Sequence, residues 1–407
     1  MKPFLDVRSL EDVRFLASRC THVLTLFSGG VDSSYLLHVL SSLSIKVTAV
    51  AIDLGDGTNH EDLRQIANHF GADLRVIDGR HAFVEEAVLP AIQAGAQYMG
   101  IYPISSSLSR PIIAKLAVDL ANRIGCEAIL HTANQSQNSL RRLNGAIRQL
   151  GYAGYSGSPY EYSAFSREEK IAALSASGLT RFQARGISGD ANLWVREYES
   201  GCLDNPEQFE APDNLYKWTA PDSVSTHHVV EITFSQGRPV ALNGHMTPLL
   251  EIIEKLNLIA GSFGIGRYSG LEHLEGGEKV LEVREAPAAS ILLAAYRHLE
   301  TATLDAELIR EKISIEQLWI REAIEGRWFG NLSRAAVGFI RETASSVTGT
   351  VTFRLRPGAA DLGSVLAENA LYLTDRDRWE KGIAIQKSAR CLADLATTEP
   401  AVCLASA

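Results

Sequence analysis

The feature that most constrains this chain is a glycine turn in the stretch THVLTLFSGGVDSSYLLHVL, residues 21–40. Residues 23–27 are apolar and β-prone, whereas residues 33–43 repeat apolar side chains at helical spacing. Glycines at the end of a strand let the backbone approach a ligand, and free N–H groups at the start of a helix attract an anion. The turn therefore predicts a site for a phosphate group.

The segments around this turn alternate between strand and helix patterns as far as about residue 150. We predict strands at 23–27, 46–52, 73–77 and 127–131, and helices at 33–43, 61–70, 83–94, 111–124 and 138–149. Strands separated by helices favour a parallel sheet with right-handed crossovers. In such a sheet the ligand lies at the carboxyl ends of the strands.

The second half of the chain has a different pattern. The loop-like segment GYAGYSGSPYEY, residues 151–162, marks the change, and SREE at 166–169 has the spacing of a capping box. Alternation through residues 227–242 predicts a hairpin with a turn at Gly237. Helical patterns follow at 248–261, 288–300 and 304–325, and another strand pattern at 349–358. We therefore expect an α+β second half.

Length and charge limit the classes of protein. A chain of 407 residues exceeds one ordinary core, so we expect two domains with an added tail. A net charge of −9 offers no general affinity for nucleic acid, and no run approaches the roughly 18 apolar residues of a membrane span. We expect a cytoplasmic protein whose odd, widely spaced cysteines are reduced, buried thiols, namely Cys20, Cys126, Cys202, Cys391 and Cys403.

The turn SGGVDS resembles the PP-loop of the ATP pyrophosphatases, and it matches neither of two other common nucleotide loops, G-x-x-x-x-G-K-[ST] and G-x-G-x-x-G. The resemblance implies an adenine nucleotide alpha-hydrolase-like domain that binds the pyrophosphate of ATP with Mg²⁺. We interpret Asp32 either as the helix cap or as a group that holds Mg²⁺ or the loop. The implied nucleotide-binding residues are Phe27, Ser28, Gly29, Gly30, Asp32, Ser33, Ser34, Ile52 and Asp53.

Three longer segments resemble the argininosuccinate synthase family. They are FVEEAVLPAIQAGAQYMGIYPISSSLSRPIIAKLAVDLANRIG (83–125), GDANLWVREYESGCLDNP (189–206) and GSFGIGRYSGLEHLEGGEKVLEVREAPAASIL (261–292). The resemblance implies an AMP-forming ligase, in which the ureido oxygen of citrulline attacks ATP and aspartate then displaces AMP.

The resemblance also implies the roles of individual residues. It gives Ser28, Asp32 and Asn138 as the catalytic group. The implied ligands of the ureido substrate are Tyr102, Ser107, Asn138, Arg142, Ser188 and Glu272.

We single out six positions that depart from the family pattern. The family writes its aspartate-binding loop T-G-K-G-N-D-Q-V-R, and this chain has NQSQNSLRR at 134–142, so a carboxylate and a cation are missing. Arg141 is the candidate replacement cation. A serine has become Glu197 and a tyrosine Arg284, which either form an ion pair or bind a different amino-acid head. The altered positions are Asn134, Ser136, Ser139, Arg141, Glu197 and Arg284.

Our leading hypothesis is a ligase of argininosuccinate synthase type that accepts an amine other than aspartate. The alternative is an ordinary argininosuccinate synthase. A PP-loop tRNA-modifying enzyme needs reactive cysteines and a basic face, and neither is visible. A non-catalytic ATP-binding regulator is disfavoured by the intact loop. We expect small-molecule substrates and no nucleic-acid or membrane partner.

The predicted domain boundaries follow the changes of pattern. We expect a PP-loop ATP-binding domain at 1–160, an α+β synthetase domain at 161–360 and a C-terminal oligomerisation segment at 361–407. The family's C-terminal helix takes part in tetramer contacts. We therefore expect a homo-oligomer, a tetramer by resemblance or else a dimer.

Overall fold

The computed structural model describes residues 6–182, 186–220 and 227–397. The helices are α1 (Leu10–Leu16), α2 (Val31–Ser41), α3 (His60–His69), α4 (Arg80–Phe83), α5 (Leu89–Gln93), α6 (Ser106–Ile124), α7 (Ser139–Gln149), α8 (Arg167–Ala176), α9 (Leu249–Ser262), α10 (Pro287–Thr303), α11 (Ala306–Ile324), α12 (Asn331–Ala344) and α13 (Arg376–Thr397). A π-helical turn at Val84–Val88 joins α4 to α5, and 3-10 turns lie at Gly201–Leu203 and Asp213–Leu215.

The strands complete the list of regular elements. They are β1 (Asp6–Val7), β2 (His22–Leu26), β3 (Lys46–Asp53), β4 (Asp73–Asp78), β5 (Gln97–Tyr98), β6 (Tyr102–Pro103), β7 (Ala128–Leu130), β8 (Tyr155–Gly157), β9 (Ser188–Ala191), β10 (Arg196–Glu199), β11 (His228–Ser235), β12 (Arg238–Leu242), β13 (His245–Met246), β14 (Arg267–His273), β15 (Lys279–Glu285), β16 (Gly349–Arg356) and β17 (Ala359–Ala367).

The first half of the chain forms a parallel sheet in the order β1-β8-β7-β2-β3-β4. Its apolar side chains bury one face against α1, α2, α3 and α8 and the other against α6 and α7. Burying both faces explains why its strands read as nearly continuous apolar runs. The predicted parallel sheet is confirmed, with β1 and β8 as additional short strands.

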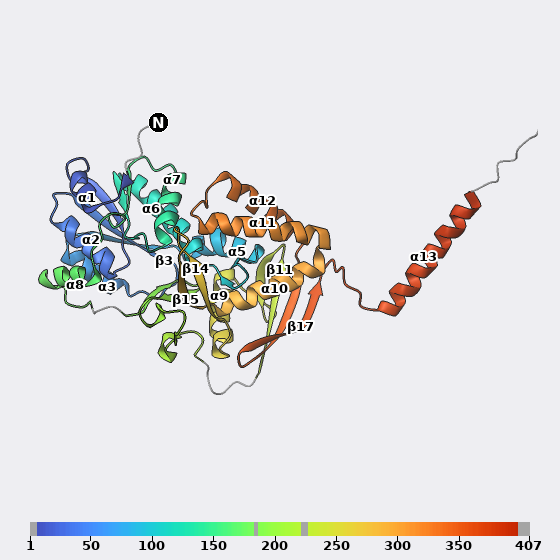
Figure 1. Ribbon diagram of the computed structural model, residues 1–407. Helices are drawn as coiled ribbons and strands as arrows, with labels where there is room; N and C mark the ends of the chain where they lie inside the picture. Colours follow the sequence, from blue (N-terminus) through green and yellow to red (C-terminus); the bar gives the residue numbers. More distant parts are fainter. Residues whose placement is uncertain (1–5, 183–185, 221–226, 398–407) are drawn as a thin grey trace, which may run out of the picture.

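The second half contains two antiparallel sheets, in the orders β14-β15-β10-β9 and β13-β12-β11-β16-β17. Helices α9 to α12 pack beside them, and α11 and α12 lie side by side (Figure 1). The α+β prediction is therefore confirmed. The largest apolar core joins both halves, because side chains of α5 and α6 pack against α9, α10 and α11.

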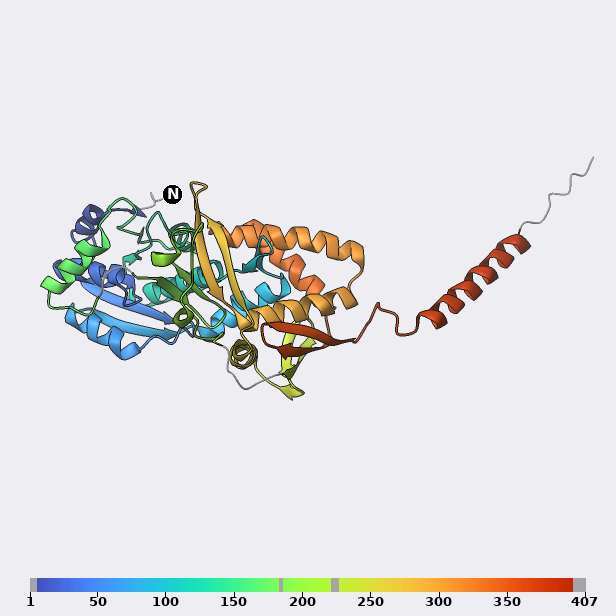
Figure 2. The ribbon, with the colours of Figure 1, turned by 60° about the horizontal axis from the view of Figure 1, so that its bottom comes forward.

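The chain leaves this body after β17 and continues to α13, which stands apart from all other helices (Figures 1 and 2). The predicted domain boundaries at residues 160 and 360 stay predictions, although β17 runs through the second one. Within the described residues no helix is long and apolar enough to cross a membrane.

The cysteine prediction is only partly right. Cys20 and Cys126 are buried free thiols, and burial raises the pKa of each to about 11. Cys202 is an exposed thiol, because it lies in a 3-10 turn on the surface, and that part of the prediction is wrong. Cys403 lies outside the described residues.

Candidate active site

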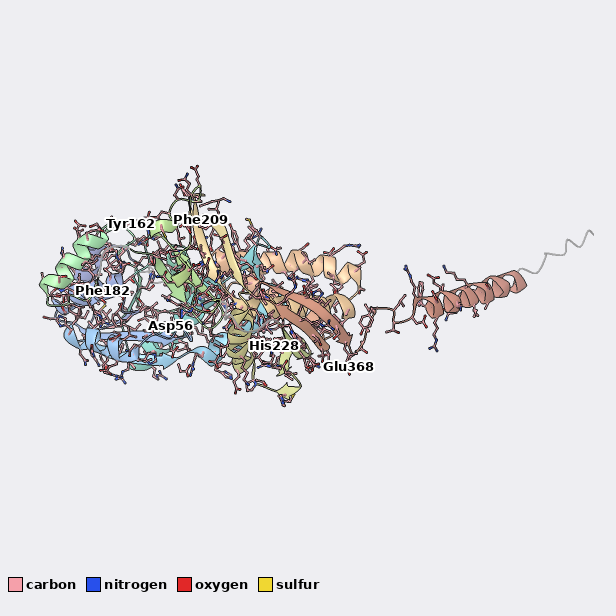
Figure 3. The ribbon with its side chains drawn as sticks, turned by 90° about the horizontal axis from the view of Figure 1, so that it is seen from below. Asp56, Tyr162, Phe182, Phe209, His228 and Glu368 are labelled. Atoms are coloured by element: carbon pink, nitrogen blue, oxygen red, sulfur yellow. The ribbon has the colours of Figure 1, made fainter. Side chains whose placement is uncertain are left out.

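A cavity of about 550 Å³ opens at the carboxyl ends of β2, β3 and β7, where the sheet topology predicts a ligand. It extends from the glycine turn to β9, β10 and β15 of the second half. Asp56, on the loop after β3, also lines it and is labelled in Figure 3. The cavity has the volume expected of a small-molecule site.

The glycine turn forms one end of the cavity. Helix α2 has Gly30 as its N-cap and no side-chain cap, so its first N–H groups are available to an anion. Gly29 adopts φ 74°, and a Cβ there would lie 2.5 Å from Cδ2 of Leu63. The Oγ atoms of Ser28 and Ser33 are 3.3 Å apart. Phe27, Ser28, Gly30, Asp32 and Ser33 line the cavity, and Gly29 and the buried Ser34 do not.

Asp32 is not the helix cap, because that position belongs to Gly30. Its Oδ1 accepts a hydrogen bond of 2.7 Å from Nζ of Lys170 on α8, and the Lys170 side chain is almost fully buried. Tyr160 donates to the Asp32 carbonyl at 2.9 Å. The cap interpretation is therefore wrong, and the structure supports the interpretation that Asp32 holds the loop.

The end of β3 forms the second wall. Ile52 and Asp53 line the cavity, and Oδ1 of Asp53 accepts from the Gly55 N–H at 2.8 Å. His60 lies 3.5 Å from Asp53. His131, after β7, also lines the cavity, and burial lowers its pKa to about 4, so it is neutral at pH 7. These neutral or hydrogen-bonded groups suit a nucleoside better than a second phosphate.

The six predicted ureido-substrate ligands divide into two groups. Asn138, Arg142 and Ser188 line the cavity. Tyr102, Ser107 and Glu272 do not, and each of them is buried.

Arg142 and Glu272 connect these groups. Nη2 of Arg142 lies 2.6 Å from Oε1 of Glu272, and Nη1 donates to Oγ of Ser106 at 2.7 Å. Asn138 donates to the same Glu272 oxygen at 2.9 Å. Burial raises the pKa of Glu272, but Arg142 and Arg284 outweigh burial and lower it to about 2. Glu272 is therefore a fixed anion that holds Asn138 and Arg142 in place.

The altered residues of the loop at 134–142 bond to one another or to residues of neighbouring elements. Asn134 accepts hydrogen bonds from the N–H and the hydroxyl of Ser136, at 3.0 and 2.7 Å. Ser139 accepts from Nε of Arg110 at 3.0 Å. Ser136 and Ser139 line the cavity, whereas Asn134 and Arg141 do not. Arg141 lies 3.5 Å from Glu325 instead, so it does not supply a cation to this cavity.

The two remaining altered residues form an ion pair, one of the two outcomes that the sequence left open. Nη1 of Arg284 lies 3.2 Å from Oε2 of Glu197. Arg284 is fully buried and does not line the cavity, whereas Glu197 does. The guanidinium of Arg284 also lies 4.2 Å from the centre of the Tyr102 ring.

Sequence reasoning missed several charged residues of the site. Arg110 pairs with Asp190, and Glu199, Glu282 and Arg167 also line the cavity. Arg110 stands in the quoted segment SLSRP, and Lys170 follows the capping box SREE. Both motifs were noted in the sequence, so both residues could have been named as candidates. Their partners come from other elements, up to 138 residues away, which no local pattern reveals.

Known protein families and known proteins match nearly the whole length of this chain. A family model described as the arginosuccinate synthase N-terminal HUP domain matches residues 22–179, and one described as the arginosuccinate synthase C-terminal domain matches residues 187–397. Proteins named argininosuccinate synthase are similar to it. That of Oceanobacillus iheyensis is 36% identical over 373 residues, 90% of this chain and 89% of that protein. That of Rubrobacter xylanophilus is 34% identical over 371 residues, 90% and 91% of the two chains.

Proposed function

This chain belongs to the argininosuccinate synthase family, and from that membership we propose that it is an ATP-dependent, AMP-forming carbon–nitrogen ligase. The observation that carries the proposal is the single cavity that joins the glycine turn to Asn138, Arg142 and Ser188. One end suits the phosphates of ATP and the other a small polar substrate. A substrate that is held between the two ends can place its oxygen for attack on the α-phosphorus.

The proposed reaction has two steps. The oxygen of a ureido group, in citrulline or a related compound, forms a bond to the α-phosphorus while the bond to pyrophosphate breaks. The nitrogen of an amine then bonds to the ureido carbon, the carbon–oxygen bond breaks, AMP leaves with that oxygen, and the amine loses a proton. The work of this chain is to position the reactants and stabilise charge.

The residues present fit ATP, because the glycine turn offers uncapped N–H groups and the serine hydroxyls of Ser28 and Ser33. Mg²⁺ is proposed as the counter-ion of the phosphates. Among the described residues no group of three His, Cys, Asp or Glu side chains has metal-site spacing, so phosphate and water would supply most of its ligands. A cytoplasmic location is part of the same proposal.

Two amine donors are candidates. The names of the relatives favour aspartate, together with citrulline as the ureido substrate. The loop at 134–142 favours a different amine, because Ser139 stands where the family has a carboxylate. Arg110, which donates to Ser139, is the cation that would receive a carboxylate of the donor if aspartate is used.

Pyrophosphate release from Mg-ATP, followed with product masses, tests the proposal. We expect release with a ureido compound and a new adduct when the correct amine is added from a panel that includes aspartate. Gly29→Ala should lower the rate by about tenfold or more, since it adds strain and a contact at the turn. Gly71→Ala is the matched control, with φ 69° but nothing within 4 Å of the new Cβ. No release with any ureido compound would refute the proposal.

A further inference from the structure

One arginine of the cavity has no partner. Arg167, in the first turn of α8, lines the cavity and is exposed. The two other arginines of the lining are occupied, since Arg110 pairs with Asp190. Arg142 pairs with Glu272. Within the part of the chain that the structure describes, the Arg167 guanidinium forms no ion pair and no hydrogen bond. Its charge is therefore available to a ligand.

Helix α8 holds Arg167 beside the glycine turn. Helices α8 and α2 pack against each other (Figure 1), and Nζ of Lys170 lies 2.7 Å from Oδ1 of Asp32 in the first turn of α2. Arg167 precedes Lys170 by three residues, so both side chains lie on one face of α8, with Cβ atoms about 5–6 Å apart. Arg167 therefore lies at the end of the cavity where α2 offers its uncapped N–H groups and where Ser28 and Ser33 offer hydroxyls.

Lys170 does not serve the same ligand. Its side chain is only 7% exposed, and its ammonium balances the charge of Asp32. The same ammonium lies 4.2 Å from the centre of the Tyr160 ring. Drawing Lys170 away would leave a carboxylate unpaired beside the turn, where it would repel a phosphate. Arg167 is the cation on this face of α8 that remains for an anion.

Arg167 opposes the stability of its own helix. The N-terminus of a helix carries a partial positive charge, so a cation in the first turn is unfavourable there. Glu168 and Glu169 in the same turn have the favourable sign, and Glu169 completes the capping box. Burial does not explain the arginine, because its side chain is exposed. A residue that breaks a local rule at the edge of a cavity indicates a functional role.

We infer that Arg167 binds the β- and γ-phosphates of ATP and stabilises pyrophosphate as it leaves. The inference rests on the proposed ligase function and adds a binding residue to it. When the bond between the α-phosphorus and pyrophosphate breaks, its electron pair stays on the pyrophosphate, so negative charge grows there. A guanidinium donates two parallel hydrogen bonds to phosphate oxygens, and these bonds strengthen as that charge grows.

ATP and AMP test the inference as a matched pair, because they share adenosine and the α-phosphate and differ only in the pyrophosphate part. Calorimetry in the presence of Mg²⁺ measures both dissociation constants. We expect Arg167→Gln to raise the Kd of ATP by about tenfold or more and to leave the Kd of AMP within about twofold of the wild-type value. Arg167→Lys should recover part of the loss, because it keeps the charge but not the paired donors.

ATP–pyrophosphate exchange with a ureido compound gives a second, kinetic measurement. In Arg167→Gln the KM for pyrophosphate should rise by about tenfold, whereas the KM for the ureido compound should stay unchanged. A residue that only shapes the cavity would alter both constants. The split between them therefore identifies a contact with pyrophosphate.

Two controls distinguish a lost contact from a folding defect. Arg64→Gln removes an exposed cation of α3 that does not line the cavity, so it should leave both dissociation constants unchanged. In urea, Arg167→Gln should be at least as stable as the wild type, because the substitution removes a cation from a helix N-terminus. A less stable variant with weaker ATP binding would contradict the argument that Arg167 opposes its own helix.

The outcomes separate the inference from the function on which it rests. Equal losses of affinity for ATP and AMP in Arg167→Gln, or a loss for the ureido compound alone, overturn the inference and leave the ligase proposal standing. An unchanged Kd for ATP does the same. If ATP binding depends on Arg167 but no ureido compound supports exchange, the ligase proposal fails and the phosphate contact stands. A wild type that binds neither nucleotide overturns both.

Discussion

At the scale of single residues, Arg142 is the side chain on which the site most depends. It is almost fully buried, and its charge is balanced by Glu272, which is also buried. Removing one partner of such a pair leaves the other charge in a poorly solvated place. Replacing Arg142 therefore affects the stability of the fold as well as the shape of the cavity.

We predict that Arg142→Met destabilises the protein by about 3–5 kcal/mol, since Glu272 keeps only Arg284 and Asn138 as partners. Denaturant unfolding measures this change. Arg148→Met is the matched control on the same helix, because Arg148 is half-exposed and should cost less than about 1 kcal/mol. Equal losses in the two variants would show that the buried pair has no special role.

The raised pKa of Glu197 predicts a dependence of stability on pH. An acid whose pKa is about 7 when folded and 4.5 when unfolded binds its proton more tightly in the folded state. Stability is therefore lost as the pH rises from 4.5 to 7, and the loss is complete above 7. Glu197→Gln lacks this titration.

We predict that the free energy of unfolding of Glu197→Gln, relative to the wild type, increases between about pH 5 and pH 8 by no more than about 3 kcal/mol. Thermal or urea unfolding at a series of pH values measures it. Glu278→Gln serves as the control, because its side chain is exposed and its difference from the wild type should stay flat. A difference that falls with pH would mean that Arg284, and not burial, determines the state of Glu197.

At the scale of elements, α8 packs against α2 and supports the glycine turn. Its capping box is complete: Ser166 accepts from the Glu169 N–H at 3.1 Å, and Glu169 accepts from the Ser166 N–H at 2.7 Å. The same helix carries Lys170 to Asp32. Helix α8 is short and partly exposed, so its cap contributes much of its stability.

We predict that Ser166→Ala weakens α8 by about 1 kcal/mol and raises KM for ATP by about fivefold, because Lys170 then holds Asp32 less firmly. Hydrogen exchange of the α8 amides and ATP kinetics measure the two effects. Glu168→Ala lies in the same turn but outside the capping box, and it should change neither. Faster exchange with an unchanged KM would separate the helix from the nucleotide site.

The elements that could be predicted are those with a strong local signal. Strand β2, helix α2 and the capping box of α8 follow from apolar runs, helical spacing and hydrogen bonds within a few residues. The hairpin of β14 and β15 was not predicted: its segment was noted only as a family motif, because charges and glycines interrupt the alternation of its strands. Helix α12 was missed altogether, although it is amphipathic.

The same limit applies to the site, where only the parts with a strong local signal could be predicted. The glycine turn is one continuous segment, and its position at the ends of β2 and β3 follows from the parallel sheet. The charge balance around Arg284 was not predictable, since its partners come from β10, β14 and β15 and the sheet that joins them is antiparallel. The sequence reduced the relation of Arg284 and Glu197 to two alternatives, and only their 3.2 Å separation decides between them.

At the scale of the whole molecule, α13 is the element that stands apart from the rest of the fold. Figures 1 and 2 show it away from the other helices, and Figure 3 labels Glu368, where the chain leaves β17 and the body. Trp379 and Ile385 on this helix are exposed. A helix of this length with exposed apolar side chains is marginal in water unless it packs against something.

We predict that α13 binds a second copy of this chain, as the family resemblance also implies. A truncation after Asp375 should therefore lower the mass in solution to that of a smaller assembly. The melting temperature of the body should change by only about 2–4 °C, less than a core deletion would cause. Light scattering with size exclusion measures the mass. Trp379→Ala should weaken the assembly, whereas Lys381→Ala, an exposed cation on the same helix, should not. The same mass with and without α13 would contradict this prediction.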